Sequence, residues 1–210
     1  MNSWNIISIL VLITIFTPIF LILYNFNINS ENWIHIKNNL LGKYIFSTVY
    51  IILGVGFLSS IIGVWSAWFV TCHDFYGRKT LEWILILPLT IPTYIAAYAY
   101  YDALELLNPV FNWSRSNIGI RETMMLENFA IYLIVIILFS FVLYPYIYLS
   151  VRASLLISGN RLVESAATLG LPSNKVFSKL ILPFIKPAII AGLSLVIMET
   201  LNDYAAVEYF

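Results

Sequence analysis

The clearest pattern along the chain is a series of long apolar runs without charged side chains. Crossing about 30 Å of hydrocarbon takes about 20 apolar residues in a helix whose backbone groups bond to one another. Five runs meet or approach this length: 6–24, 44–72, 83–101, 129–151, and one that starts at Pro187 and becomes acidic at Glu199. Polar loops lie between them at 25–43, 73–82, 102–128 and 152–186. The pattern predicts an all-α polytopic membrane protein with five spans present.

The loops predict an orientation for these spans. The first run has no basic segment before it and no small-residue cleavage site after it, so we expect a retained helix and not a signal peptide. Loops 73–82 and 152–186 together carry seven Lys and Arg, whereas loops 25–43 and 102–128 carry four. Because loops rich in Lys and Arg stay in the cytoplasm, we expect the first two loops and the amino terminus to be cytoplasmic. Five spans without a polar tail predict a fragment, the alternative being a complete short protein.

Composition supports a membrane location and excludes several function classes. The 210 residues are 60% hydrophobic and 10% charged, with a formal net charge of zero, whereas soluble domains carry roughly a quarter charged residues. Without basic clusters, a nucleic-acid partner is excluded. A single cysteine excludes an intrachain disulfide, and two separate histidines do not form a metal site. No phosphate-binding Gly-rich loop or hydrolase signature occurs, so we expect no cofactor and no enzyme activity in this chain.

The loop at 152–186 is too long for a simple connector, and its pattern predicts two short helices. The first would begin at Asn160, carry apolar residues at three- and four-residue spacing, and end in a left-handed turn at Gly170. The second would lie between Pro172 and Pro183. Such a pair of helices could rest on lipid headgroups. It could equally form a surface for a partner protein, because small residues at 165–167 permit close approach.

The spacing within this loop is similar to the Glu-Ala-Ala motif of permeases in binding-protein-dependent ABC transporters. That motif reads Glu-Ala-Ala, three residues, Gly, nine residues, Ile, one residue, Leu-Pro. The matching positions here are Glu164, Ser165, Ala166, Gly170, Leu180, Leu182 and Pro183. Ser165 replaces the first alanine of the motif, and Leu180 replaces the isoleucine. The resemblance implies that these residues couple the membrane helices to a separate ATPase, with Glu164 and Gly170 as the main coupling residues.

Other segments resemble the ferric iron permeases, and the resemblance covers about residues 44–210. The similar segments are 77–78, 81–83, 87–94, 97–100, 143–148, 198–204 and 207–210. Between the last two, an Ala-Ala pair stands where that family usually has Gly-Thr. The resemblance implies a MetI-like transmembrane domain over 44–210, incomplete at its carboxyl end, with the coupling loop at 152–186. A transmembrane helix and a periplasmic loop would precede this domain at 1–43.

The same resemblance implies an assembly in the bacterial inner membrane. A complete transporter of this kind has two six-helix permease halves, two cytoplasmic ATPase subunits and a periplasmic iron-binding protein. With five spans, this sequence resembles the amino-terminal half, cut before its sixth helix. ATP hydrolysis is then expected in the partner subunit.

Carboxylates and tyrosines within the spans are candidates for the substrate pathway, because lipid exposure of a charge costs several kcal/mol. Glu199 and Asp203 would share one face if the last helix continued through both. Tyr98 and Asp102 would share another face, and oxygen ligands of this type suit a trivalent metal. The alternatives are solvated carboxylates at the outer surface and a belt of tyrosines at the membrane interface.

Glycines and prolines predict how the spans pack and bend. Gly54, Gly56 and Gly63 lie in the second span and favour close approach of a neighbouring helix. Three further residues, Pro88, Pro92 and Pro145, lie inside spans, where each removes a backbone donor and favours a kink.

Two other function classes stay open: a secondary transporter without an ATPase, and a structural or assembly protein of the membrane. Secondary transporters typically carry paired broken helices near the bilayer midplane, and no such pair stands out in the sequence. Within the importer class, thiamine, sulfate and polyamine permeases are alternatives to ferric iron. The sequence therefore predicts an ABC importer permease, with ferric iron as the first substrate to consider.

Overall fold

The computed structural model describes residues 3–24, 31–168 and 172–203, except for some side chains that include those of residues 158–167. All regular structure within these residues is helical. Four helices are long and apolar enough to cross a membrane, or five if one bent pair forms a single span. The prediction of an all-α membrane protein is confirmed. The chain divides into two compact units, Met1–Ser47 and Thr48–Phe210.

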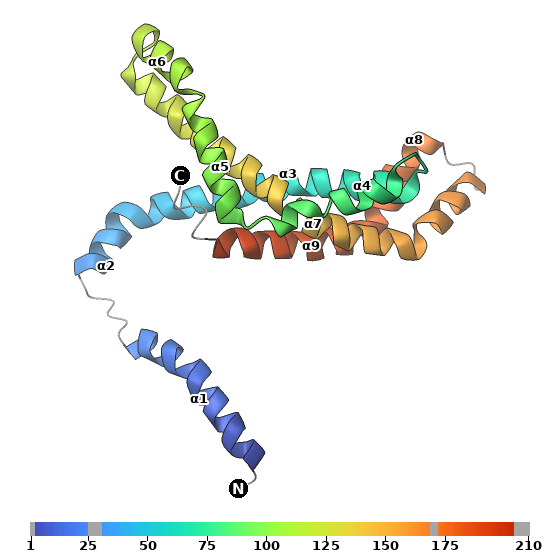
Figure 1. The fold of residues 1–210 in the computed structure, drawn as a ribbon, viewed down its shortest axis with the longest axis horizontal. Helices are drawn as coiled ribbons and strands as arrows, with labels where there is room; N and C mark the ends of the chain where they lie inside the picture. The colour runs from blue at the N-terminus through green and yellow to red at the C-terminus, as the bar shows by residue number, and fades with distance from the viewer. Residues whose placement is uncertain (1–2, 25–30, 169–171, 204–210) are drawn as a thin grey trace. The chain divides into compact units, whose positions relative to one another are not determined.

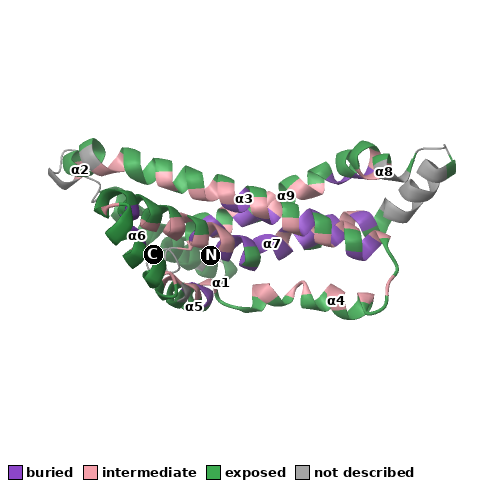
Figure 2. Cartoon of the chain, turned by 90° about the horizontal axis from the view of Figure 1, so that it is seen from above, coloured by how far each residue is buried: buried purple, intermediate pink, exposed green. Residues whose placement is uncertain are grey.

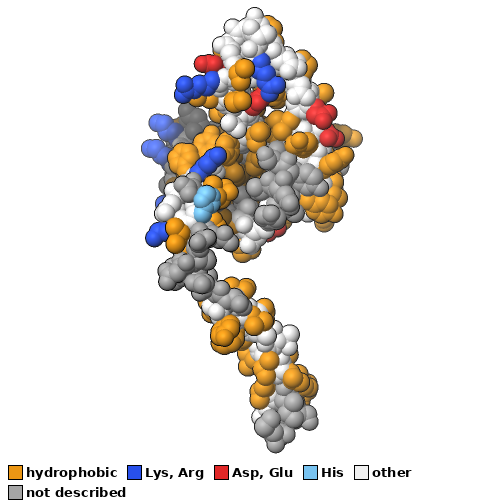
Figure 3. All heavy atoms as spheres, turned by 90° about the vertical axis from the view of Figure 1, so that its left-hand side faces the viewer, with side chains coloured by type: hydrophobic (Ala, Val, Ile, Leu, Met, Phe, Trp, Pro, Cys, Tyr) orange, Lys and Arg blue, Asp and Glu red, His pale blue; other side chains and the backbone are white. Residues whose placement is uncertain are grey.

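The first unit contains helix α1 (Ser3–Tyr24), helix α2 (Glu31–His35), the π-helical turn η1 (Ile36–Leu40) and the start of α3 (Leu41–Cys72). No residue in the apolar segment Ile7–Tyr24 is buried within the chain. Hydrophobic side chains follow the described part of α1 at the bottom of Figure 3. The hydroxyls of Ser8, Thr14 and Thr17 donate to carbonyls four residues earlier, so these three polar groups are satisfied without water. This helix therefore suits a position surrounded by lipid.

In the second unit, α7 (Ile120–Thr168) packs between α3 and α9 (Leu182–Asn202). The three helices run along one another in Figures 1 and 2, and the buried residues follow α7 through its middle. Close packing depends on glycine. A Cβ atom at Gly63 would lie 2.9 Å from Ile147 Cβ, and one at Gly54 would lie 2.6 Å from Ile136 Cδ1. The predicted role of the second-span glycines in close helix packing is confirmed.

The third expected span, 83–101, is not one helix. It consists of α4 (Arg78–Ile84), the 3-10 turn η2 (Leu87–Thr90) and α5 (Thr93–Glu105), with an 87° bend between the two halves. Proline explains the break, because Ile91 before Pro92 adopts an extended conformation with φ −91° and ψ 117°, as a residue before proline prefers. The prolines were expected to kink this span, but the bend is far larger than a kink.

A tight hairpin joins α6 (Asn108–Asn117) to the start of α7. Gly119 stands at the turn with φ 135°, a conformation that side chains strain and glycine allows. The buried Thr123 hydroxyl donates to Ser114 Oγ at 2.9 Å and fixes the two helices against each other. The region 102–128, which the sequence predicts as a polar loop, therefore forms a helical hairpin.

The fourth expected span and the first short helix of the 152–186 loop form one continuous helix. α7 spans 49 residues, about 74 Å at 1.5 Å per residue, which is more than twice the hydrocarbon thickness. The predicted helix start at Asn160 is wrong, because residues 152–160 contain no proline and a single glycine costs a helix only about 1 kcal/mol. α7 is therefore one continuous helix, and Pro145 lies inside it.

The second short helix also continues into the membrane. Pro172 is extended and caps α8 (Ser173–Val176), which passes into the π-helical turn η3 (Phe177–Ile181) and then α9. The prediction that Pro183 closes this helix is wrong. Pro183 lies at the start of α9, directly after the π-helical turn η3, and the helix continues through it. The last candidate span is Phe177–Asn202, so it begins well before Pro187.

Candidate functional site

The two loops predicted to share one side of the membrane meet at one end of the second unit. Arg152 of α7 contacts Glu82 of α4 at 2.7 Å, and the Phe177 ring of η3 stacks on Trp65 of α3. The end of α3, all of α4, the later part of α7 and the turn η3 therefore form one region. The prediction that these loops lie on the same side agrees with this arrangement.

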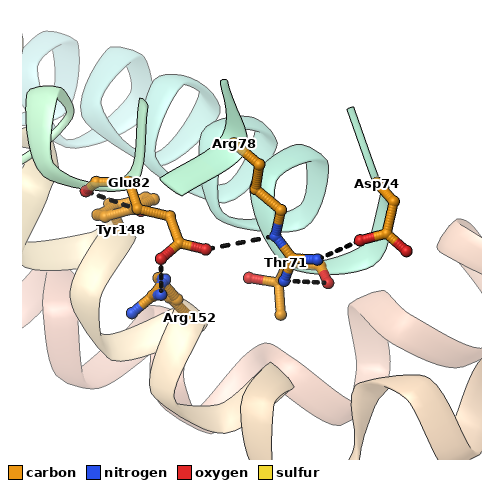
Figure 4. Close-up of polar contacts among 6 residues, drawn as sticks. All are labelled: Thr71, Asp74, Arg78, Glu82, Tyr148 and Arg152. Atoms are coloured by element: carbon orange, nitrogen blue, oxygen red, sulfur yellow. Dashed lines mark hydrogen bonds and ion pairs between the residues drawn. The ribbon is translucent and has the colours of Figure 1, made fainter. Parts of the chain in front are cut away.

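A network of polar side chains, here called the Glu82 network, holds α4 in this region (Figure 4). Arg152 Nη2 donates to Glu82 Oε2 at 2.7 Å, and Arg78 Nε donates to Glu82 Oε1 at 3.3 Å. Arg78 also donates to the Asp74 carboxylate at 2.6 Å and to the Thr71 carbonyl at 3.4 Å. The Tyr148 hydroxyl donates to the Glu82 carbonyl at 3.4 Å. Two arginines and two carboxylates make the network neutral.

The contacts of the network differ in strength. The Glu82 and Arg152 side chains are 21% and 23% exposed, whereas the Asp74 side chain is 96% exposed. Solvent screens the Asp74 contact, so that contact contributes little. Arg152 Nε is fully buried without a hydrogen-bond partner among the described residues. Removing the Glu82 carboxylate would leave Arg152 with both its charge and this donor uncompensated.

Aromatic rings attach η3 to the end of α3. The centroid of Phe177 lies 5.2 Å from that of Trp65 and 4.8 Å from that of Trp68. Trp68 packs edge-on against His73 at 4.9 Å, and His73 stacks on Phe69 at 5.5 Å. Ring pairs at these separations contribute about 0.5–1.5 kcal/mol beyond their buried area. The start of the last span therefore rests on α3 through an aromatic cluster.

A separate hollow lies near the other end of α7, between α5, α6 and α7. It has a volume of about 390 Å³ and includes the Arg115–Glu127 ion pair in its lining. The remaining lining residues are Tyr101, Leu104, Glu105, Asn108, Phe111 and Ile131. Tyr98 and Asp102 do not line it.

The sequence matches the family of binding-protein-dependent transport system inner membrane components over residues 59–210. This is well over half of the chain, and it includes the network, the aromatic cluster and the predicted coupling loop. The chain belongs to this permease family.

Its relatives include permease proteins of sulfate and molybdenum transport systems. The sulfate transport system permease proteins CysT of Salmonella typhimurium and Escherichia coli are each 26% identical, over 151 and 152 residues. Each match covers 72% of this chain and 52% of the relative. The molybdenum transport system permease protein ModB of Haemophilus influenzae is 24% identical over 153 residues, 71% of this chain and 62% of the relative. The chain thus spans about half the length of the sulfate permeases that it matches.

These relatives confirm the permease family and leave ferric iron unsupported. The segments that resembled ferric iron permeases, such as 87–94, all lie within residues 59–210, the range that matches the wider family. They therefore indicate the wider family and do not identify a substrate.

The predicted coupling residues of the permease fall on three elements. Glu164, Ser165 and Ala166 lie on the last part of α7, where side chains are outside the described set, and Gly170 lies outside the described residues. Leu180 is half-buried in η3, whereas Leu182 and Pro183 at the start of α9 are exposed. Leu182 and Pro183 thus leave a surface free within this chain, directly after the turn that the aromatic cluster holds.

The predicted pathway residues lie on two separate helices. Glu199 is half-buried on α9. The helix does not continue through Asp203, which caps α9 with ψ 73° while its N–H still donates to the Glu199 carbonyl. Tyr98 and Asp102 are exposed on α5. Among the described residues no group of three or more His, Cys, Asp or Glu could hold a metal ion.

Sequence reasoning missed the Glu82 network. Glu82 and Arg152 are 70 positions apart, and no spacing rule relates residues on different helices. One signal was available: each is a charged residue at the end of an apolar run, and both runs end on the same predicted side. Opposite charges in such positions favour pairing, because a lone charge at the membrane boundary is costly.

We expect Phe177→Ala to lower the thermal midpoint of the purified permease, with a loss of about 2 kcal/mol in the free energy of unfolding. The substitution removes both ring contacts to α3 and leaves a cavity beside Trp68. Thermal unfolding in detergent measures the effect. Phe184→Ala is the matched control, because Phe184 is exposed and has no ring contact within the described chain; equal midpoints for the two variants would contradict the role of the cluster.

Proposed function

We propose that this chain is a membrane-spanning part of the permease subunit of an ATP-driven importer in the bacterial inner membrane. The family match over 59–210 carries the proposal, because it contains the complete motif spacing from Glu164 to Pro183. The ATPase subunits, an external binding protein and a second permease half are the proposed partners. The basic loops at 73–82 and 152–186 would face the cytoplasm, as would the amino terminus.

In this function, the segment from Glu164 to Pro183 receives the movement of the ATPase pair. Closure of the ATPases on ATP would shift this segment and change which side of the membrane the pathway opens to. Two continuous helices lead from it into the bilayer: α7, which runs from Thr168 back to Ile120, and α9, which follows η3 without interruption. Glu164, Ser165, Ala166, Gly170, Leu180, Leu182 and Pro183 are the proposed coupling residues.

The importer class is tested with the full-length coding sequence, expressed together with its ATPase and binding protein and reconstituted in liposomes. We expect substrate uptake that requires ATP on the ATPase side and stops when the ATPase is omitted. Uptake driven by an ion gradient without the ATPase would instead assign the protein to the secondary transporters.

For the substrate, we favour an oxyanion of the sulfate or molybdate type. The names of the relatives, permease proteins of sulfate and molybdenum transport systems, support this choice over the other importer substrates. Ferric iron is the second candidate, favoured by Glu199, Asp203, Tyr98 and Asp102 as hard oxygen donors. The two candidates have opposite charge, so the carboxylates at the end of α9 should affect them in opposite ways.

The double substitution Glu199→Gln and Asp203→Asn distinguishes these substrates. If sulfate or molybdate passes near α9, removing two negative charges leaves uptake unchanged or raises it by about two- to fivefold, because a repulsion is lost. Uptake of radiolabelled sulfate, molybdate and ferric iron by the same preparations measures this. Ferric iron uptake in the native protein that falls in the variant would contradict the oxyanion proposal and assign the carboxylates to a cation pathway.

A further inference from the structure

α4 is held to the rest of the permease by polar contacts and not by apolar burial. None of its seven residues is buried, and the Trp83 and Ile84 side chains are 74% and 50% exposed. A short helix with this exposure gains little from the hydrophobic effect within the chain. The position of α4 therefore depends on its hydrogen bonds and ion pairs, which converge on Glu82.

Glu82 accepts two hydrogen bonds from α7. Its carboxylate accepts from Arg152, and its backbone carbonyl accepts from the fully buried Tyr148 (Figure 4). Both partners lie on α7, one turn apart, so the carboxyl group and the main chain of Glu82 are fixed to the same face of that helix. Arg78 orients the other carboxylate oxygen and is in turn tied to the end of α3.

The position of Arg152 along α7 allows its contact with Glu82 to transmit movement from α7 to α4. It lies on the same uninterrupted helix as Glu164, Ser165 and Ala166. On the other side of the contact, α4 leads through η2 and the bend at Ile91 and Pro92 into α5. A displacement of the coupling end of α7 would therefore reach the broken span through Glu82.

We propose that Glu82 and Arg152 are positioning residues that make α4, and with it the broken span 78–105, move together with α7 during the transport cycle. The inference rests on the proposed function of the segment from Glu164 to Pro183 as the ATPase-coupling element. It adds a third route from that element into the membrane, beside α7 itself and α9. Loss of the Glu82–Arg152 contact uncouples α4 from α7 and leaves the coupling segment from Glu164 to Pro183 in place.

The test uses the complete transporter in liposomes and measures both uptake and ATP hydrolysis. Arg152→Ala and Glu82→Ala should each lower the uptake per ATP hydrolysed about tenfold, since coupling between sites is typically worth a factor of this size. The double variant should lose the same factor and not its square, because the two side chains act as one contact. Arg152→Lys keeps the charge and should recover at least about a third of native coupling.

Asp74→Ala is the matched control within the same network. Its carboxylate also pairs with an arginine, but it is exposed and does not contact α7, so coupling should stay within about twofold of the native value. Losses that multiply in the double variant would overturn the proposal. So would ATP hydrolysis that falls as far as uptake does, because a general folding defect lowers both.

A second measurement does not depend on the substrate. Spin labels at Lys79 of α4 and Ala153 of α7, both exposed, report the separation of these helices in the assembled complex with Cys72 replaced by alanine. We expect one distance distribution that is the same without nucleotide and after trapping with ADP and vanadate, and a broadened distribution in Arg152→Ala. A native distance that changes between the two states would overturn the proposal. A native complex without ATP-dependent uptake of either oxyanion would count against the proposed substrate and leave this measurement intact.

Discussion

Gly192→Val is expected to prevent the permease from accumulating as a folded protein. A Cβ atom at this position of α9 would lie 2.7 Å from the Cα atom of Ile147 and 3.1 Å from the Tyr146 carbonyl oxygen. Both are backbone atoms of α7, which no change of rotamer can move. Overpacking a well-filled contact with extra methyl groups costs about 1–3 kcal/mol or more, and valine adds three carbon atoms where the first already overlaps.

The rest of the bundle blocks the obvious relief. Moving α7 away from Gly192 would drive it toward α3, where the Cβ of Ile147 already lies 2.9 Å from the Cβ position of Gly63. Ile147 has no exposed surface, so α7 is confined from both sides at this residue. Separation of the helices is then the remaining way to accommodate valine, and it exposes the core of the unit.

Size-exclusion chromatography of a fluorescent fusion in detergent, with a thermal midpoint, measures this effect. Gly42→Val is the matched control, because a Cβ atom at Gly42 would meet nothing within 4 Å. Gly56→Ala should give an intermediate result, since it meets only the flexible end of Leu193, at 3.1 Å. A Gly192→Val protein that is as monodisperse and as stable as Gly42→Val would refute the packing argument.

The helix contacts show which features of the fold the sequence predicts and which it does not. Three glycines close together in one apolar run indicated close packing of α3, and the structure confirms it. Gly192 is a single glycine in its run and therefore formed no comparable pattern. Its contact is nevertheless close, because a Cβ atom there would lie 2.7 Å from the backbone Cα atom of Ile147. Apolar runs identify helices in a membrane, but the partner of each helix depends on shapes that a one-dimensional pattern does not contain.

Helix ends were the least predictable part of the fold. Asn160 and Pro183 are good helix-boundary residues in isolation, yet α7 and α9 pass through them. Both boundary rules describe what a residue favours when a helix ends there, and neither forces an end when the neighbouring residues favour helix. At Pro92 the helix does end, because Ile91 before it is extended and so leaves the helical conformation. How strongly a proline predicts the end of a helix therefore depends on its place in that helix.

For the site, the motif spacing identified the coupling segment, while the contacts that connect it to the membrane helices came from the structure. Glu82 with Arg152, and Phe177 with Trp65, join residues that are far apart in sequence. The substrate could not be predicted from the sequence for a different reason. Segments shared by permeases of the whole family describe how the helices fold and couple, and these demands are the same for iron and for sulfate.

Gly170→Asp is expected to abolish uptake while leaving the permease in the membrane. Gly170 lies outside the described residues, and its role is predicted from the sequence as the left-handed turn after the first helix of the coupling segment. A side chain there would strain the turn by about 1 kcal/mol or more and re-aim the helices on either side. α7 ends at Thr168, and α8 starts at Ser173 and contacts α7.

Membrane fractions, ATP-driven uptake and co-purification of the ATPase separate the possible causes of this loss. Because the bundle of α3, α7 and α9 is formed by other residues, the amount of Gly170→Asp protein in the membrane should match the native amount. Gly170→Asn is the control for the charge, since asparagine has nearly the same size as aspartate and adopts the left-handed conformation readily. Uptake retained in the asparagine variant alone would place the defect in the added charge at the ATPase surface. Native uptake with native ATPase association in Gly170→Asp would remove the residue from the coupling route, and with it the assignment of the turn between α7 and α8 as the point where the ATPase acts.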